Sequence, residues 1–342
     1  MSSSPEERPR RLVVPLAWRG LRLDRFLASA LAGEAEAPSR AELQRWIGQG
    51  LVKIGARQAR AADRLREGDE IWVTQAPPRV TTALPDASVV FRVLHVDPAI
   101  VVIDKPAGLV VHPARGHASG TLVNGLLAAG YFDALREPSR GAVAQGEGGD
   151  EDGDEESDHV RPGVVHRLDK DTSGVMVVAR TAEARERLKV QFAAHTIDRE
   201  YEAIAEGAVG DMTLATLHGR HPSVRTRFSS RVATGKRAVT HVRVLRAFAR
   251  GLATHVACRL ETGRTHQIRV HLADAGHPLL GDTLYGRVSK NVHLARICSA
   301  LGRQALHARR LGFVHPTSGE RVVFEAEPPE DFMEALGGLA LL

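Results

Sequence analysis

The stretch at residues 161–174 limits the possible folds of this chain more than any other feature of the sequence. It reads Arg-Pro-Gly-Val-Val-His-Arg-Leu-Asp-Lys-Asp-Thr-Ser-Gly, and an apolar run rich in valine follows directly at residues 175–179. Pro-Gly and Ser-Gly pairs are typical of turns, whereas a short apolar run of this kind is typical of a buried strand. The pattern predicts a loop that leads into a core strand, with Asp169 inside the loop.

Asp169 allows two interpretations at this point. Asp, Ser, Thr and Gly make ordinary solvated turns, so the loop by itself does not indicate chemistry. A His-Arg pair and an apolar residue stand directly before Asp169, at His166, Arg167 and Leu168. These neighbours favour a buried, polarised environment, in which a carboxylate is a candidate for catalysis.

The charge of the chain predicts a polyanionic partner. The 342 residues are 43% hydrophobic and 25% charged, which suits a globular protein of two domains. The net charge is +5, but residues 147–158 hold eight acidic residues and no Lys or Arg, so the remainder carries +13. An excess of this size favours RNA, DNA or an anionic membrane as a partner.

Several other classes of protein are not expected. No run approaches about 18 apolar residues, and the polar start of the chain lacks the apolar core of a signal peptide, so we expect a cytoplasmic protein. Cys258 and Cys298 have neither disulfide-framework nor metal-type spacing. The histidine pairs lack helical i,i+4 spacing, and the acidic segment lacks glycine at the sixth position of a calcium loop, so we expect no metal.

The chain divides into regions of different composition. We expect a disordered tail at residues 1–10, a small module at 11–74, a proline-containing linker at 75–88 and a large domain at 89–335. A Gly-rich acidic insert at about 138–159 cannot bury enough surface to become ordered. Strands and helices alternate without a steady βαβ pattern in the large domain, which predicts an α+β fold with a large mixed, mainly antiparallel sheet.

The small module has the pattern of a compact α/β unit. Apolar residues recur at helical spacing from Leu23 to Leu31, and a second helix is expected after Ser39, with short strands near residues 52–54 and 70–73. Residues 40–66 hold seven Lys or Arg and two acidic residues. Such a concentration suits contact with a phosphate backbone, although a solvated helix face would look similar.

The large domain offers two partners for Asp169. An ionised carboxylate in a pocket needs a cation, because an unpaired buried charge costs several kcal/mol. Arg269 lies among apolar residues of a helix predicted to follow residues 263–265 and to run to Ala275, and it is a candidate for that cation, unless its stem carries the charge to solvent. Tyr201, one of three tyrosines, starts an alternating strand and by itself is more typical of a core position.

The chain resembles two known families in sequence. The small module resembles the S4-type RNA-binding domain through Leu-Asp-Arg-Phe-Leu at residues 23–27, Ser39-Arg40, Gln44, Ile47, Gly50-Leu51-Val52 and Gly68-Asp69-Glu70-Ile71. It departs at Lys53-Ile54-Gly55, where that family often has Val-Asn-Gly. The large domain resembles the RluA-type ribosomal RNA pseudouridine synthases, in the branch with an N-terminal S4 domain. That resemblance rests on Ile103-Asp104-Lys105-Pro106-Ala107-Gly108-Leu109 with Val111-His112-Pro113, His166-Arg167-Leu168-Asp169 with Thr172-Ser173-Gly174, Arg199-Glu200-Tyr201, Gly263-Arg264-Thr265-His266-Gln267-Ile268-Arg269-Val270-His271, Gly276-His277-Pro278 with Gly281-Asp282, and Leu306-His307-Ala308.

The resemblance implies an enzyme that isomerises uridine to pseudouridine in RNA. Asp169 is then the catalytic carboxylate, acting on C1′ as a nucleophile or on the C2′ proton to give a glycal, and the sequence does not choose between these. Arg269 is its pairing cation, and Tyr201 lies against the uracil. The target base must be flipped out of folded RNA. Arg167 is expected to fill the vacated space and His166 to support the loop, with Ile268 and Leu306 forming pocket walls and Leu168 counted with them among the substrate-binding residues. The resemblance implies no cofactor. Arg40, Arg45 and Lys53 are the RNA-binding candidates of the small module.

Two rivals and several open points remain. His-Arg-Leu-Asp-Lys superficially resembles the catalytic loop of protein kinases, but no Gly-rich phosphate loop or Asp-Phe-Gly accompanies it. A non-catalytic RNA-binding or ribosome-assembly protein would not need Asp169. Large-subunit, 23S-type ribosomal RNA, free or in pre-ribosomal particles, is the expected substrate, with transfer RNA as the alternative. A monomer is expected, and no membrane partner.

Overall fold

The computed structural model describes residues 9–31, 38, 40–74, 83–112, 119–132, 163–224, 226–248, 251–286, 289 and 291–342, without the side chains of residues 40–42. The described residues divide into two compact units, one within residues 1–82 and one that begins at Ala83. Most of the expected tail and linker, the expected cap at Ser39 and the whole acidic insert lie outside the described residues.

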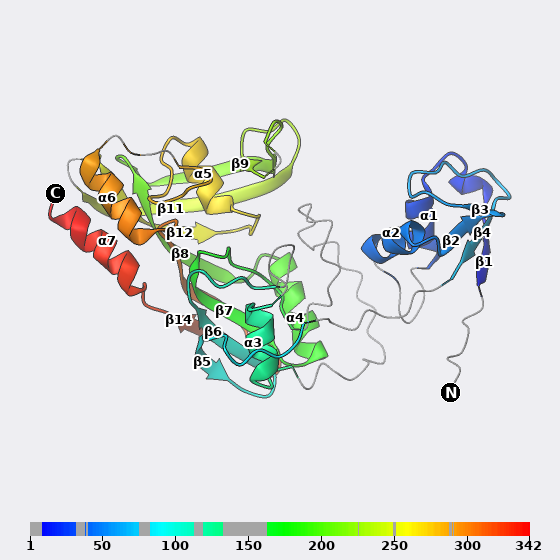
Figure 1. The fold of residues 1–342 in the computed structure, drawn as a ribbon, viewed down its shortest axis with the longest axis horizontal. Coiled ribbons are helices and arrows are strands. Elements are labelled where there is room, and N and C mark those ends of the chain that lie inside the picture. Colours follow the sequence, from blue (N-terminus) through cyan, green and yellow to red (C-terminus); the bar gives the residue numbers. More distant parts are fainter. Residues whose placement is uncertain are drawn as a thin grey trace. The chain divides into compact units, whose positions relative to one another are not determined.

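The first unit packs two helices on a small antiparallel sheet (Figure 1). Its elements are β1 (Arg10–Val13), a 3-10 turn (Leu16–Trp18), α1 (Leu23–Ala30), α2 (Arg40–Gly48), β2 (Val52–Ile54), β3 (Arg57–Gln58) and β4 (Glu70–Val73). The strands lie in the order β1-β4-β2-β3. Leu23 and Leu27 of α1 and Leu43 of α2 are fully buried against Ile71 of the sheet. The apolar residues at helical spacing therefore form the core of this unit, as expected.

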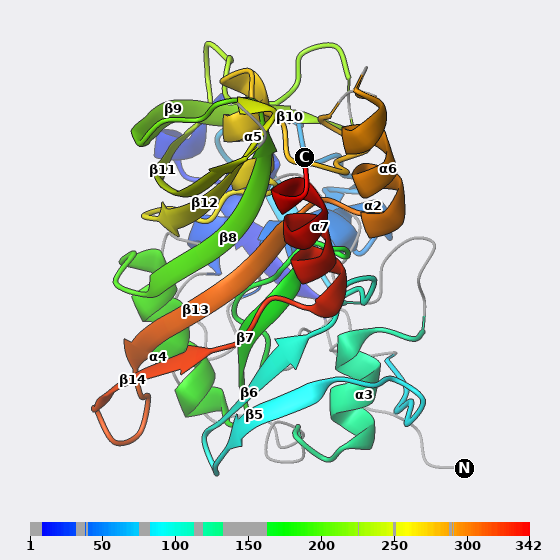
Figure 2. The same cartoon turned by 90° about the vertical axis from the view of Figure 1, so that its left-hand side faces the viewer.

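The second unit is built on one large sheet. Its strands are β5 (Arg92–Val96), β6 (Ile100–Lys105), β7 (Ser173–Ala179), β8 (Asp198–Glu206), β9 (Met212–Arg220), β10 (Phe228–Ser229), β11 (Lys236–Phe248), β12 (Ala253–Leu260), β13 (Leu306–Val314) and β14 (Arg321–Glu325). They follow the order β10-β9-β11-β12-β8-β13-β7-β6-β5, and β14 pairs with β13, as Figure 2 shows. Among the described strands, β13 and β7 form the single parallel pair. The expected α+β class with a mainly antiparallel sheet is confirmed.

Helices cover both faces of this sheet. Because side chains alternate along a strand, neighbouring residues of β6, β7 and β8 enter different cores. On one face, α3 (Leu122–Ala128) packs on β6 and β7, and α5 (Gln267–Asp274) packs on β8 and β12. On the other face lie α4 (Ala182–Ala193), α6 (Val292–Leu301) and α7 (Glu330–Ala340). Tyr201 contacts the cores beneath both α3 and α5, so these two helices flank it on one face.

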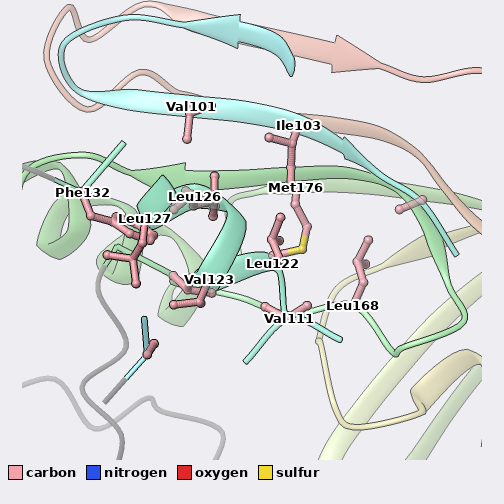
Figure 3. Packing of buried hydrophobic residues seen from close by; sticks show 14 residues of the cluster. Val101, Ile103, Val111, Leu122, Val123, Leu126, Leu127, Phe132, Leu168 and Met176 are labelled. Carbon is pink, nitrogen blue, oxygen red and sulfur yellow. The ribbon is translucent and has the colours of Figure 1, made fainter. Parts of the chain in front are cut away.

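The core beneath α3 also reaches the loop that carries Asp169. Leu122 and Leu126 of α3 face Ile103 of β6 and Met176 of β7, and Leu168 lies at the edge of the same cluster (Figure 3). Leu168 is 5% exposed. The residue directly before Asp169 is therefore an anchor in the core, as its apolar character indicates.

The structure differs from the expected organisation in three places. Residues 83–88 were expected in the linker, but Ala83 is buried in the core under α3 and the Asn124 side-chain amide donates to the Leu84 carbonyl at 2.7 Å. The large domain was expected to end at residue 335, but its last helix, α7, continues to Ala340 and buries Leu339. Strands β9 and β11 were not expected, since their exposed positions carry polar and charged residues that obscure the apolar pattern.

Candidate active site

The loop before β7 is fixed to the sheet at both of its described ends. Val164 bridges to Val178, and Gly163 has a φ of 68° where a Cβ atom would meet the Ala179 carbonyl oxygen at 2.0 Å. Gly174 has a φ of 118°, and its Cβ would lie 2.2 Å from the Ala308 oxygen of β13. Glycine is thus required at both positions, by backbone angle and by space. The loop returns to the sheet where β7 runs beside β13.

Three side chains from elsewhere in the chain hold the loop just after Asp169. The ammonium of Lys105, at the end of β6, donates to the carbonyls of Pro106, Leu109 and Lys170, each at 2.9 Å. Arg303 donates to the Asp171 carbonyl at 3.1 Å, and Gln304 donates to the Thr172 hydroxyl at 3.2 Å. The backbone around Asp169 is therefore bound to segments that lie far away in sequence.

Lys105 is an unusual anchor, because its side chain is fully buried. Burial lowers the pKa of Lys105 to about 7, while the charges of Asp169 and Asp171 act in the opposite direction. Its three carbonyl acceptors match the three protons of an ammonium group, which favours the charged form.

Asp169 belongs to a chain of three charged groups. Arg269 Nη1 donates to Asp169 Oδ2 at 2.8 Å. The rest of the guanidinium binds Asp282 in bidentate fashion, with Nε to Oδ2 at 2.7 Å and Nη2 to Oδ1 at 3.0 Å. The Arg269 side chain is 8% exposed and that of Asp282 is 0% exposed, whereas that of Asp169 is 21% exposed. Asp169 is thus the end of the chain that faces outward.

The electrostatics of this chain keep its buried members charged. Burial alone would lower the pKa of Arg269, but its hydrogen bonds and the charges of Asp282 and Asp169 raise the pKa above its usual value. Burial would likewise raise the pKa of Asp282, but Arg269 and the backbone N–H groups of Tyr285 and Leu284 hold that pKa below its usual value. The partner inferred for Asp169 from the sequence is therefore in place, and a second carboxylate locks it.

His266 and Tyr285 complete the surroundings of Asp169. His266 Nε2 lies 3.8 Å from Asp169 Oδ1, and His266 Nδ1 lies 2.8 Å from the Tyr285 hydroxyl. That hydroxyl accepts from the backbone N–H of Phe228 at 3.0 Å, and Arg269 lies over the Tyr285 ring with its Cζ 5.2 Å from the centroid. Burial lowers the pKa of His266, although the charge of Asp169 opposes the shift, and burial raises the pKa of Tyr285 to about 12.

The other predicted residues of the catalytic domain occupy different parts of this face. Tyr201 is half-buried, and burial raises its pKa, with the charge of Asp169 adding to the shift and that of Arg199 opposing it. Ile268 and Leu306 are each 4% exposed and share the core beneath α5 with Tyr201. Arg167 is exposed beside Asp169. These residues converge on one face, although Ile268 and Leu306 lie in the core and show little surface.

His166 supports the loop from below. Its Nε2 accepts from the Val177 backbone N–H at 3.1 Å, and its ring stacks on Phe192 with centroids 4.6 Å apart. Burial, with the charge of Arg199, lowers the pKa of His166 to about 3. A neutral ring that accepts from β7 makes His166 a structural residue of the loop.

The RNA-binding candidates of the first unit lie on its second helix and second strand. Arg45 is half-buried in the last turn of α2, and Lys53 is exposed on β2. The side chain of Arg40 lies outside the described residues.

Sequence reasoning did not assign roles to six residues that surround or support Asp169. They are Lys105, His266, Asp282, Tyr285, Arg303 and Gln304. Lys105, His266 and Asp282 fall inside motifs that carry the family resemblance, so the signal was present without a role attached to it. Tyr285, Arg303 and Gln304 stand outside those motifs, and nothing in their sequence context points to the site.

Two other kinds of feature are absent from the described residues. No group of three or more His, Cys, Asp or Glu in the described ranges is arranged to hold a metal ion. Within the same part of the chain, no helix is long and apolar enough to cross a membrane.

Comparisons with known proteins identify the family. The RNA pseudouridylate synthase family model matches residues 99–274. Ribosomal large subunit pseudouridine synthase D of Neisseria meningitidis is 40% identical over 99% of this chain and 84% of that protein. The protein of the same name from Xanthomonas campestris is 41% identical over 96% of this chain and 92% of its own length. The chain therefore belongs to the RNA pseudouridylate synthase family, and the enzyme class expected from the sequence is confirmed.

A solved structure supports the fold. Human RNA Pseudouridylate Synthase Domain Containing 1 matches with a TM-score of 0.51 and 23% sequence identity, over 72% of this chain and 86% of that one. This likeness concerns the architecture of the second unit and its mainly antiparallel sheet.

Proposed function

We propose that this enzyme isomerises uridines of large-subunit ribosomal RNA, with Asp169 as the catalytic carboxylate. The assignment rests on the different contacts that the two Asp169 oxygens make. Oδ2 is bound by Arg269, which Asp282 locks in turn, whereas Oδ1 lies 3.8 Å from His266 Nε2, beyond the length of a direct hydrogen bond. A carboxylate held by one oxygen has a fixed position and can offer the other oxygen to a substrate.

The reaction needs one bond to break and one to form at C1′. The N1–C1′ bond of uridine breaks, the uracil rotates, and C5 bonds to C1′; C5 then loses its proton and N1 gains one. Asp169 Oδ1 is free either to attack C1′ or to remove the C2′ proton, and both routes need the ionised carboxylate. Arg269 serves both routes by stabilising that charge.

Tyr201 and Arg167 have distinct proposed roles. Tyr201 belongs to the cores beneath both α3 and α5 and lies near enough to feel the charge of Asp169, so its ring is placed to face a uracil at that carboxylate. Arg167 is exposed two residues before Asp169, which suits it to fill the space of a base flipped out of an RNA helix. Leu168, which lies between Arg167 and Asp169 in sequence, is buried and fixes the spacing between these two residues.

Release of tritium from C5-labelled uridine in ribosomal RNA transcripts tests the catalytic assignment. We expect release by the wild type and none by Asp169→Asn, with RNA affinity retained, since only the reacting charge is lost. Asp171→Asn, two residues further along the same loop, is the matched control and keeps release. Equal release by wild type and Asp169→Asn would contradict the role of Asp169, and RNA binding without any release would favour a non-catalytic protein.

The choice of RNA rests on the relatives, whose names specify the large ribosomal subunit. We propose the first unit as an S4-type module that binds the RNA backbone through Arg40, Arg45 and Lys53. A ribosomal substrate, free or in a pre-ribosomal particle, would place the enzyme in the cytoplasm. Mapping pseudouridines in RNA from a deletion strain tests this: a site lost from large-subunit RNA and restored by wild type, but not by Asp169→Asn, is expected. Loss from transfer RNA alone would redirect the proposal.

A further inference from the structure

The gap between His266 and Asp169 has a specific size. His266 Nε2 and Asp169 Oδ1 are 3.8 Å apart, which is longer than a direct hydrogen bond. It is short enough for a single oxygen atom to lie within hydrogen-bonding distance of both. Both side chains are 21% exposed, so a substrate can reach the gap.

The surroundings of His266 decide what its Nε2 atom offers. The Tyr285 oxygen already accepts the Phe228 N–H at 3.0 Å, so its single proton is available to His266 Nδ1 at 2.8 Å. In a neutral ring with Nδ1 as acceptor, the proton resides on Nε2. Burial lowers the pKa of His266 and favours that neutral ring. Nε2–H is therefore a donor at one end of the gap, and Asp169 Oδ1 is an acceptor at the other end.

Only a group that accepts and donates at once can occupy such a gap and satisfy both atoms. A uridine inside an RNA chain has one such group. Its O3′ and O5′ atoms are phosphodiester oxygens without protons, its two uracil carbonyls only accept, and its N3–H only donates. The ribose 2′-hydroxyl does both, and it is also the group that distinguishes RNA from DNA.

We propose that His266 Nε2–H and Asp169 Oδ1 together hold the 2′-hydroxyl of the target uridine, which makes His266 a substrate-specificity residue. The inference rests on the proposed role of Asp169. Either route for Asp169 brings its free oxygen next to C1′ and C2′, and the 2′-hydroxyl is attached to C2′. A hydroxyl that accepts from His266 and donates to Asp169 fixes the sugar at the reacting carboxylate. A deoxyribose leaves His266 without its acceptor.

Backbone geometry provides a matched pair of variants. His266 and His195 are the two described non-glycine residues with positive φ, at 57° and 56°. Asparagine tolerates this left-handed conformation better than most residues. His266→Asn therefore keeps the backbone and removes the Nε2 donor, because the asparagine amide reaches only to the level of the histidine Nδ1. His195→Asn makes the same change at an exposed position after α4.

The test is equilibrium binding of two RNA oligonucleotides that span the mapped site. One carries uridine at the target position and the other carries 2′-deoxyuridine there. The protein is the full chain; any pseudouridine formed during the measurement still has its 2′-hydroxyl. We expect the deoxy substitution to weaken binding about 30-fold, the effect of two net hydrogen bonds. In the His266→Asn background the factor falls to about 5-fold, because only the hydrogen bond to Asp169 remains, while His195→Asn keeps the full factor.

A second variant guards against a folding defect in His266→Asn. Tyr285→Phe leaves the histidine in place but removes the hydroxyl that fixes its tautomer, so we expect the deoxy penalty to shrink there as well. An equal penalty with and without His266, or no penalty in the parent protein, would overturn the proposal. Neither result affects tritium release by the wild type, so the proposed function and the role of His266 can fail separately.

Discussion

Two ion pairs of almost identical length show how differently the two units use charge. In the first unit, Arg57 Nη1 lies 2.7 Å from Asp63 Oδ2, and the Arg57 side chain is 57% exposed. In the second unit, Arg269 Nε lies 2.7 Å from Asp282 Oδ2, and both side chains are almost completely buried. Water screens the first pair and contributes little to the surroundings of the second. The same contact therefore has a small effect on stability in one place and a large one in the other.

The two units use charge differently because we propose a different kind of RNA contact for each. The proposed catalytic carboxylate needs a fixed position, and Asp169 obtains it from Arg269, with Lys105 and Arg303 holding the backbone beside it. The RNA-binding surface that we propose for the first unit needs charge more than position, so exposed residues such as Lys53 suit it. Removing single charges from each region should separate these two uses.

Asp282→Asn should have the largest effect. The substitution keeps the size of the side chain but leaves the buried Arg269 without its bidentate partner, and breaking a buried pair in this way costs about 3–5 kcal/mol of unfolding free energy. Arg269 would also lose its fixed orientation, and a displacement of the groups around Asp169 would lower kcat by about 100-fold. Urea unfolding and single-turnover tritium release measure the two effects.

Asp63→Asn is the matched control in the first unit. It removes the same charge from an arginine at the same distance, and we expect a loss of at most about 1 kcal/mol and an unchanged kcat. Similar losses of stability in the two variants would show that burial does not separate these pairs.

The second-largest effect is expected at His166, beneath the loop that carries Asp169, and it concerns the pH dependence of stability. The folded-state pKa of His166 is about 3, against an ordinary value of 6.5. Between these values the unfolded chain binds a proton that the folded protein does not, so His166 lowers stability as the pH falls from about 6.5 towards 3, by at most about 1.4 kcal/mol per pH unit. His166→Gln keeps an acceptor for the Val177 N–H and lacks this dependence. Unfolding at several pH values should show the wild type losing stability faster on acidification.

Phe192→Leu tests the cause of this pH dependence. The stacked Phe192 ring helps to exclude water from His166, so the smaller side chain should admit water and weaken the acid sensitivity of the wild type. Identical pH profiles for wild type and His166→Gln would mean that His166 does not remain neutral in the folded protein.

The sequence predicted the fold well where a pattern is local. Leu23 and Leu27 show helical spacing, and the apolar run before residue 180 is the core strand β7. Strand β11 was missed because charged residues such as Arg243 and Arg246 occupy its exposed positions. The final helix, α7, was not predicted, and it continues beyond the domain end expected at residue 335. Pairing between strands distant in sequence, such as β13 with β7, depends on tertiary contacts that no local pattern records.

The sequence predicted those parts of the site that follow from the need to pair a buried charge. A buried carboxylate needs a cation, which led to Arg269, and the structure places it at hydrogen-bonding distance from Asp169. The same reasoning applied once more would have asked what holds a buried arginine, and Asp282 is the answer. Tyr285 and the tautomer that it gives His266 could not be found in this way, because they depend on the close approach of three segments.

The smallest effect is expected in the first unit. Replacing Arg45 and Lys53 together by alanine should weaken RNA binding about 3- to 10-fold at low salt and reduce the slope of log K against log salt by about 1 to 2, because up to two phosphate contacts are lost. The rate of tritium release at saturating RNA should not change, since neither side chain belongs to the second unit. Binding measured over a range of salt concentrations gives the slope.

Lys189→Ala with Arg243→Ala removes two exposed cations from the second unit and is the control for net charge. If the first unit binds RNA through local contacts, this control should leave the salt slope nearly unchanged while lowering the overall charge by the same amount. Equal salt slopes for the two double variants would mean that RNA binding depends on the total charge of the protein and not on where the cations lie. The first unit would then have no RNA-binding surface of its own, and the description of the site around Asp169 would be unaffected.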